Sequence, residues 1–219
     1  MKKLALLVIS TFLLLMLPQA SAANTVIRIT GPIHQTFTGE FRNDDLAQSL
    51  TPSGDLGLKV FQPFAKNRTW VIDAALIDEV ILMSGEYTLA TVAEPAGKEI
   101  ATAWLTQLKR VTTGNDVVAL AYGNPDIALA QRLAPSELKN YFVYGQDRLQ
   151  LALGRIVRSE PEVQWSVGKS GLSNPLRKNY SDNRKALTRL SRVVDTPELM
   201  QLRARLAQLL SPTLSKDSR

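Results

Sequence analysis

Two stretches of the chain share one pattern, in which a short apolar run ends at a polar residue and passes directly into helical spacing. The first run covers residues 69–73 and leads into residues 74–84, and the second covers residues 117–122 and leads into residues 124–133. Apolar residues follow one another in each run without alternation, which indicates strands buried on both faces, as in a parallel sheet. Polar groups at the carboxyl ends of such strands commonly form binding or catalytic sites. We therefore expect both junctions to lie on the same edge of one sheet.

The remaining pattern predicts an α/β fold with a mostly parallel sheet and flanking helices. Further strands are expected over residues 26–29, 87–92 and 163–167. Five strands are too few for a complete eight-stranded (β/α) barrel, so the sheet is either open or a partial barrel. Helices are expected over residues 46–50, 56–64, 74–84, 96–111, 127–133, a short segment from 135, 146–157, 182–194 and 197–210. The α/β domain is expected to cover residues 23–180, with basic helices in residues 181–219 packed on it or extending from it.

The first 22 residues have the pattern of a secretory signal peptide. Lys2 and Lys3 precede an apolar stretch over residues 4–17, and small residues end the segment at Ala22. This arrangement predicts cleavage after Ala22 and an extracytoplasmic, soluble product with no later membrane span. The alternative is an uncleaved N-terminal anchor, for which the apolar stretch is short.

The composition excludes several classes of site. The chain has no cysteine, which excludes Cys nucleophiles, thiolate metal sites and iron–sulfur clusters. A single histidine, His34, excludes sites with two or more His ligands, and no Gly-x-Ser-x-Gly motif accompanies it as in many Ser-His-Asp enzymes. The chain also lacks a Gly-rich phosphate loop. We expect neither a metal nor a cofactor, and a loop position without a special role for His34.

Positive charge is concentrated in the last third of the chain. Residues 151–219 carry 13 Lys and Arg against 6 Asp and Glu, whereas residues 23–150 carry 11 against 14. For an exported protein, such a segment favours cell-wall glycan or an anionic envelope polymer as partner. Nucleic acid is not expected, because no aromatic residues are interleaved with the basic ones. The alternative is the solvated face of two terminal helices.

Four segments carry a resemblance to a known family: FRNDDLA at residues 41–47, TWVIDAALID at 69–78, AWL at 103–105 and VVALAYGNPDIA at 117–128. Together they span roughly residues 39–133. They resemble an uncharacterised family of large, secreted, glycoprotein-like actinobacterial proteins, whose genes commonly lie near a MurJ-type lipid II flippase. The resemblance implies a β/α domain like the barrels of glycoside hydrolases or deacetylases.

The chain departs from the family pattern at several points. Ala74 stands where the family has proline after the first strand. Asn124 replaces the first acid of the motif after the second strand, and the first proline of that motif is missing. The chain also stops where family members continue for several hundred residues. The chain therefore resembles a shortened member of this family, in which one acid of the motif is replaced.

Five residues are candidates for a site at the strand ends. Asp73 and Asp126 are the candidate carboxyl pair for cleavage of a glycosidic bond. Tyr122 and Asn124 are candidates for hydrogen bonds to sugar hydroxyls, and Trp165 either stacks on a sugar face or points into the core. The structural alternative is that Asp73 and Asn124 cap helices and that Asp126 favours a helix dipole.

The sequence therefore predicts an exported cell-envelope protein that acts as a non-catalytic binding or accessory module in cell-wall biology. The alternative is a glycan hydrolase with a glycoside-hydrolase-like β/α fold. The acid missing at Asn124 favours the first function, because an amide cannot act as an ionised base.

Overall fold

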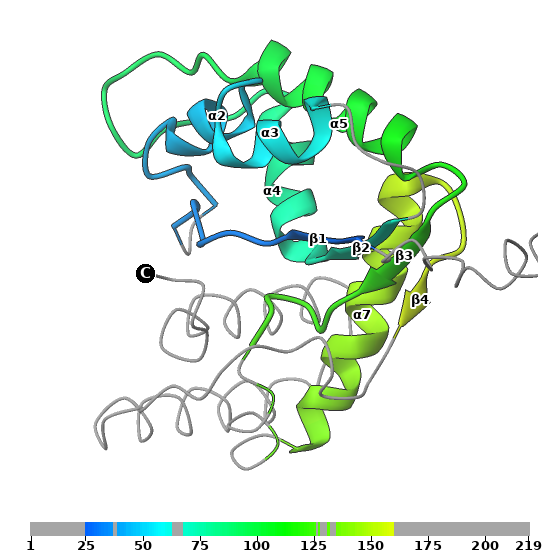
Figure 1. Ribbon diagram of the computed structural model, residues 1–219. Coiled ribbons are helices and arrows are strands. Elements are labelled where there is room, and N and C mark those ends of the chain that lie inside the picture. The colour runs from blue at the N-terminus through cyan, green and yellow to red at the C-terminus, as the bar shows by residue number, and fades with distance from the viewer. Residues whose placement is uncertain are drawn as a thin grey trace, which may run out of the picture.

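The computed structural model describes residues 25–36, 39–62, 68–125, 127, 131 and 135–159. Within them, a parallel sheet has the strand order β1-β2-β3-β4, which is also the order along the chain (Figure 1). The strands are β1 (Thr25–Ile29), β2 (Arg68–Ile72), β3 (Asp116–Ala119) and β4 (Arg158–Ser159). The α/β class and the parallel sheet expected from the sequence are confirmed, whereas the partial barrel stays a prediction.

Both faces of the central strands are buried, as their continuous apolarity predicts. Trp70 pairs in register with Ile27 on one side and Val117 on the other, and all three belong to the main core. Val71 and Val118 point to the opposite face, where they form a second buried cluster together with Leu120. Alternation along each strand therefore supplies two apolar surfaces rather than one.

The helices lie in layers over the sheet. In Figure 1, α4 (Ala74–Met83) lies next to the sheet, and α2 (Asp45–Leu50), α3 (Asp55–Phe61) and α5 (Lys98–Thr112) lie beyond it. The indole of Trp104 on α5 is fully buried, and its Nε1 donates a hydrogen bond to the carbonyl of Leu56 on α3 at 3.0 Å. This bond satisfies the polar atom of a large side chain that otherwise contributes apolar contact area to the core.

A long helix, α7 (Pro135–Leu153), packs against α4, β3 and β4. The sequence predicted a short helix from residue 135 and a separate one over residues 146–157, and this division is wrong. Gly145 lies inside the continuous helix, where a Cβ atom would come within 2.4 Å of the Leu120 carbonyl oxygen. The glycine is therefore explained by the close approach of α7 to the chain beyond β3 rather than by a helix break. Gly154, with φ of 68°, ends the helix.

The strand expected over residues 87–92 is also absent. Leu89 makes an isolated bridge with Phe41, supported by the bond from the Ala90 amide to the Phe41 carbonyl at 2.7 Å. Val92 is fully exposed, so its β propensity is not matched by a buried face.

Several predicted elements lie outside the described residues. They are the strand at residues 163–167, the helices at 182–194 and 197–210, and the signal peptide. None of the helices in the described part of the chain combines the length and apolarity needed to cross a membrane.

Candidate functional site

Asp73 follows β2 and is almost completely buried, with 3% of its surface exposed. Its Oδ1 accepts a hydrogen bond from the Ala75 amide at 3.0 Å, which makes Asp73 the N-cap of α4. The same oxygen accepts a bond from the Gly123 amide at 2.9 Å. One carboxylate oxygen thus joins the start of α4 to the turn that follows β3. The predicted capping role is confirmed, and the two strand-to-helix junctions meet at the same edge of the sheet.

The turn after β3 has two consecutive residues in the left-handed region. Gly123 has φ of 78° and Asn124 has φ of 44°, and the Asn124 amide donates to the Ala121 carbonyl at 2.8 Å. Asparagine tolerates this conformation better than most residues other than glycine. The turn directs the Gly123 amide back toward Asp73.

Tyr122 points into the helical layer and is 7% exposed. Its hydroxyl donates to Oδ2 of Asp78 on α4 at 2.9 Å, and its ring meets Tyr144 of α7 edge to face, with centroids 4.7 Å apart. Burial, with the nearby Asp78 carboxylate, raises the pKa of Tyr122 well above its usual value. This geometry gives Tyr122 a packing role between the two helices.

Asp78 also pairs with Arg148 of α7 in a forked arrangement. Arg148 Nη2 lies 2.7 Å from Asp78 Oδ1, and Nε lies 3.0 Å from Oδ2. The side chain of Arg148 is 29% exposed and that of Asp78 is 12% exposed, so the pair is partly withdrawn from water. The hydrogen bonds to Asp78 raise the pKa of Arg148 further. This cluster of Asp78, Tyr122 and Arg148 fastens α7 to α4.

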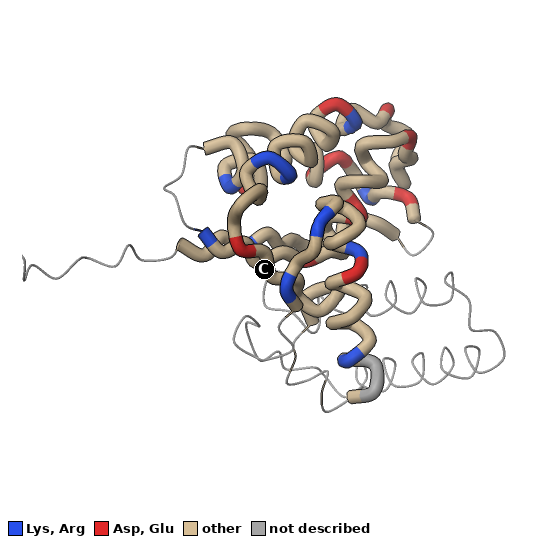
Figure 2. Tube along the Cα trace, turned by 90° about the vertical axis from the view of Figure 1, so that its right-hand side faces the viewer, with Lys and Arg blue, Asp and Glu red and all other residues tan. Residues whose placement is uncertain are grey.

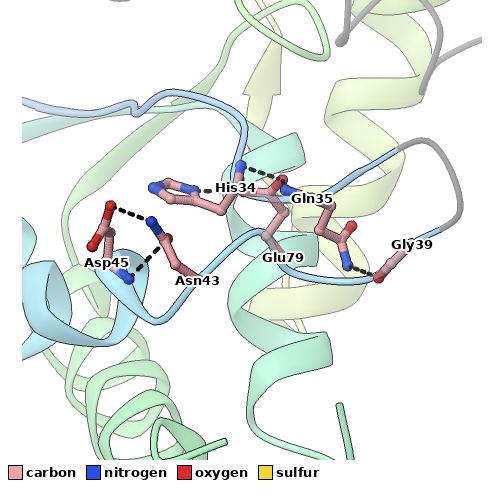
Figure 3. A network of polar contacts seen from close by, with 6 residues as sticks. All are labelled: His34, Gln35, Gly39, Asn43, Asp45 and Glu79. Carbon is pink, nitrogen blue, oxygen red and sulfur yellow. Dashed lines mark hydrogen bonds and ion pairs between the residues drawn. The ribbon is translucent and has the colours of Figure 1, made fainter. Parts of the chain in front are cut away.

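Glu79, next along α4, receives the loop that follows β1 (Figure 3). Its Oε2 lies 2.8 Å from His34 Nδ1, and its Oε1 accepts from the His34 amide at 3.1 Å and the Gln35 amide at 3.3 Å. Glu79 is 2% exposed and His34 is 10% exposed. Two backbone donors and one ring nitrogen therefore satisfy a buried carboxylate. His34 has a structural partner that the sequence did not predict.

Asp73 is influenced by the charges of two other acids, Asp78 and Glu79. Burial raises the pKa of Asp73 to about 7, the two backbone hydrogen bonds oppose this rise, and the charges of Glu79 and Asp78 add to it. A carboxyl group with such a pKa can hold a proton near neutral pH, which is a property of general acids. Its burial and its two internal bonds are properties of a structural group.

Of the remaining candidates from the sequence, Asn124 is among the described residues. Asp126 and Trp165 lie outside the described residues, so the distance between the Asp73 and Asp126 carboxyl groups stays untested. Asn124 is partly exposed beside the Gly123 turn, at the edge where the sequence placed it. Within the described ranges, no group of three acidic or histidine side chains is arranged to hold a metal ion.

Sequence reasoning missed Asp78, Glu79 and Arg148. A signal was present for the two acids, because the other eight residues of α4 are all apolar. An acid within a helix so uniformly apolar has to face a protein partner at some point, since little of the helix surface meets water. No comparable signal marked Arg148, whose partner is 70 residues away.

Comparison of the chain with protein-family models, with curated proteins and with solved structures gave no match in any of the three.

Proposed function

We propose that the chain is an exported, non-catalytic module of the cell envelope that binds cell-wall material. The observation that carries this proposal is the internal engagement of the acids near the carboxyl edge of the sheet. Asp73 is bonded to two backbone amides, Asp78 to Tyr122 and Arg148, and Glu79 to the loop that contains His34. A glycosidase acid or base has to reach the substrate, and these carboxylates are directed to protein donors instead.

Charge supports the choice of partner. The described part of the chain has its acidic and basic positions interspersed, as Figure 2 shows along the trace. The excess of positive charge is in the sequence of residues 151–219, at a net +7. A segment with this excess attracts polyanions at low ionic strength. The ligand we propose is therefore anionic cell-wall polymer or glycan, contacted through residues 181–219, which lie outside the described residues.

Co-sedimentation with purified cell-wall material tests this proposal. We expect binding that weakens as salt is added and that is lost in the double variant Arg184→Glu with Arg189→Glu. The matched control is Lys109→Glu with Arg110→Glu, which makes the same change in net charge at two exposed positions of α5. Equal binding by the wild type and the Arg184/Arg189 variant would contradict the proposal, as would an equal loss in both double variants.

A second function, hydrolysis of a glycan, is favoured by the placement of Asp73 at the carboxyl end of β2, where burial raises its pKa to about 7. A carboxyl group protonated near pH 7 has the property required of the acid that protonates a leaving group. Release of soluble fragments from peptidoglycan would support this function if Asp73→Asn and Asp126→Asn each abolished it. Activity that persists in both variants would exclude these residues as its catalytic pair.

A further inference from the structure

An open cavity of about 530 Å³ lies at the opposite edge of the sheet from Asp73. Its walls come from the start of β3, from β4, and from the connection between α7 and β4. The residues that line it are Asn115, Asp116, Val117, Gln146, Arg155, Ile156, Val157, Arg158 and Ser159. A cavity of this size is within the range of those that hold small organic ligands.

The connection that forms one wall is held in a defined shape. The amides of Gly154 and Arg155 both donate to the Gln150 carbonyl, at 2.8 and 3.2 Å. The Val157 amide donates to the Gln150 side chain at 3.3 Å, and Gln146 Nε2 donates to the Val157 carbonyl at 2.9 Å. Two glutamines of α7 therefore fix the backbone on both sides of Ile156.

Charge in the walls is unbalanced in favour of a cation. Arg158 and Asp116 neutralise each other through two hydrogen bonds, of 3.1 Å from Nε and 2.7 Å from Nη2. The remaining ionisable lining residue is Arg155. Its Nη2 is withdrawn from water and has no hydrogen-bond acceptor among the described residues. Loss of hydration lowers the pKa of Arg155, because it destabilises the charged form of the guanidinium.

An apolar side chain lies beside this cation. Ile156 follows Arg155 directly and is 90% exposed, while Val157 is buried in the same wall. Arg155 is itself partly exposed in the cavity wall, so a ligand with an anionic group beside an apolar group would contact both Arg155 and Ile156. We propose that this cavity binds a small amphipathic anion, a carboxylate or a phosphate monoester, with its charged group at Arg155 and its apolar part at Ile156.

Titration of the full chain with hexanoate, hexyl phosphate and the neutral 1-hexanol, followed by NMR, tests the site. We expect at least one anion to bind roughly tenfold more tightly than 1-hexanol, because a charge-assisted hydrogen bond contributes that much or more. The preferred anion distinguishes a carboxylate ligand from a phosphate ligand. Equal binding of the alcohol, or no binding of either anion at millimolar concentrations, would overturn the proposal.

Variants assign the binding to the named residues. Arg155→Gln should reduce anion affinity to that of 1-hexanol, and Lys139→Gln, at an exposed position of α7, should leave it unchanged. Arg158→Gln should also weaken anion binding, because it leaves the Asp116 charge without its partner in the wall. Unchanged affinity in Arg155→Gln, or an equal loss in Lys139→Gln, would contradict the site. This inference does not depend on the proposed function, because the two arginines tested there, Arg184 and Arg189, are unaltered in these variants.

Discussion

The carboxylate of Asp73 and the amide of Gly123 are joined by a hydrogen bond of 2.9 Å across 50 residues of sequence. The bond connects the two strand-to-helix junctions that share one sequence pattern. Because Oδ1 of Asp73 also accepts from the Ala75 amide, one atom caps α4 and holds the turn after β3. Because this carboxyl group is buried, we expect the stability of the protein to depend on pH.

Stability should fall as pH rises from about 4 to 7 because of Asp73. Burial raises its pKa from 3.8 to about 7, so in this window the native state keeps a proton that the unfolded state releases. The loss reaches at most about 4 kcal/mol above pH 7. Urea unfolding at several pH values should show it in the wild type, and the difference from Asp73→Asn should change across the same window.

Asp116→Asn is the control for that experiment. Arg158 lowers the pKa of Asp116, so the stability that this pair contributes is present above pH 4 and is lost only as pH falls further. Between pH 4 and 7, the free energy of unfolding of Asp116→Asn should change with pH in parallel with that of the wild type. Parallel curves for Asp73→Asn and the wild type would contradict the raised pKa.

The pairing of Asp78 with Arg148 should contribute measurably to stability, because both side chains are partly withdrawn from water. Arg148→Met leaves the Asp78 carboxylate with Tyr122 as its donor, and we expect a loss of about 1–3 kcal/mol, between the values for surface and buried pairs. A double-mutant cycle with Asp78→Asn measures the coupling. The more exposed Arg158 and Asp116 pair is the reference, with an expected coupling below about 1 kcal/mol. Equal coupling energies in the two pairs would show that burial does not determine how strongly an ion pair stabilises this protein.

Glu79→Gln should destabilise the protein by about 1–3 kcal/mol, because an amide has one acceptor oxygen where the carboxylate has two. The two oxygens of Glu79 hold the His34 ring and the amides of His34 and Gln35. Chemical denaturation measures the loss, and the nitrogen shifts of the His34 ring report whether its contact is broken. Glu86→Gln, on an exposed side chain, should change stability by less than about 0.5 kcal/mol. An unchanged His34 spectrum in Glu79→Gln would contradict the assigned contact.

Gly145→Ala should destabilise α7, although alanine ordinarily favours a helix by about 1 kcal/mol over glycine. The added Cβ would lie 2.4 Å from the Leu120 carbonyl oxygen and 3.0 Å from the Tyr122 amide nitrogen. We expect a loss of about 1–3 kcal/mol from the forced displacement of the helix. Gly85→Ala is the matched control, because its nearest atom would be 3.5 Å away, and thermal unfolding should show little change there. A stabilised Gly145→Ala variant would show that α7 lies farther from the chain beyond β3.

The sequence by itself determined the α/β class, the central strands β2 and β3, and the N-cap at Asp73. These features depend on residues a few positions apart, because strand burial is encoded in continuous apolarity and a cap forms with an amide two residues ahead. Asp78 and Glu79 stand out in the sequence as acids inside an apolar helix, but their partners cannot be identified from it.

Tertiary structure decided which distant groups meet. His34 reaches Glu79 across 45 residues and Arg148 reaches Asp78 across 70, and both contacts depend on how a loop and α7 pack against α4. Tertiary packing also turns Tyr122 into the helical layer, and residues 87–92 form one isolated bridge, from Leu89 to Phe41, instead of the expected strand. Local propensity carries no information on these contacts, because their energy arises only when the helices have covered the sheet.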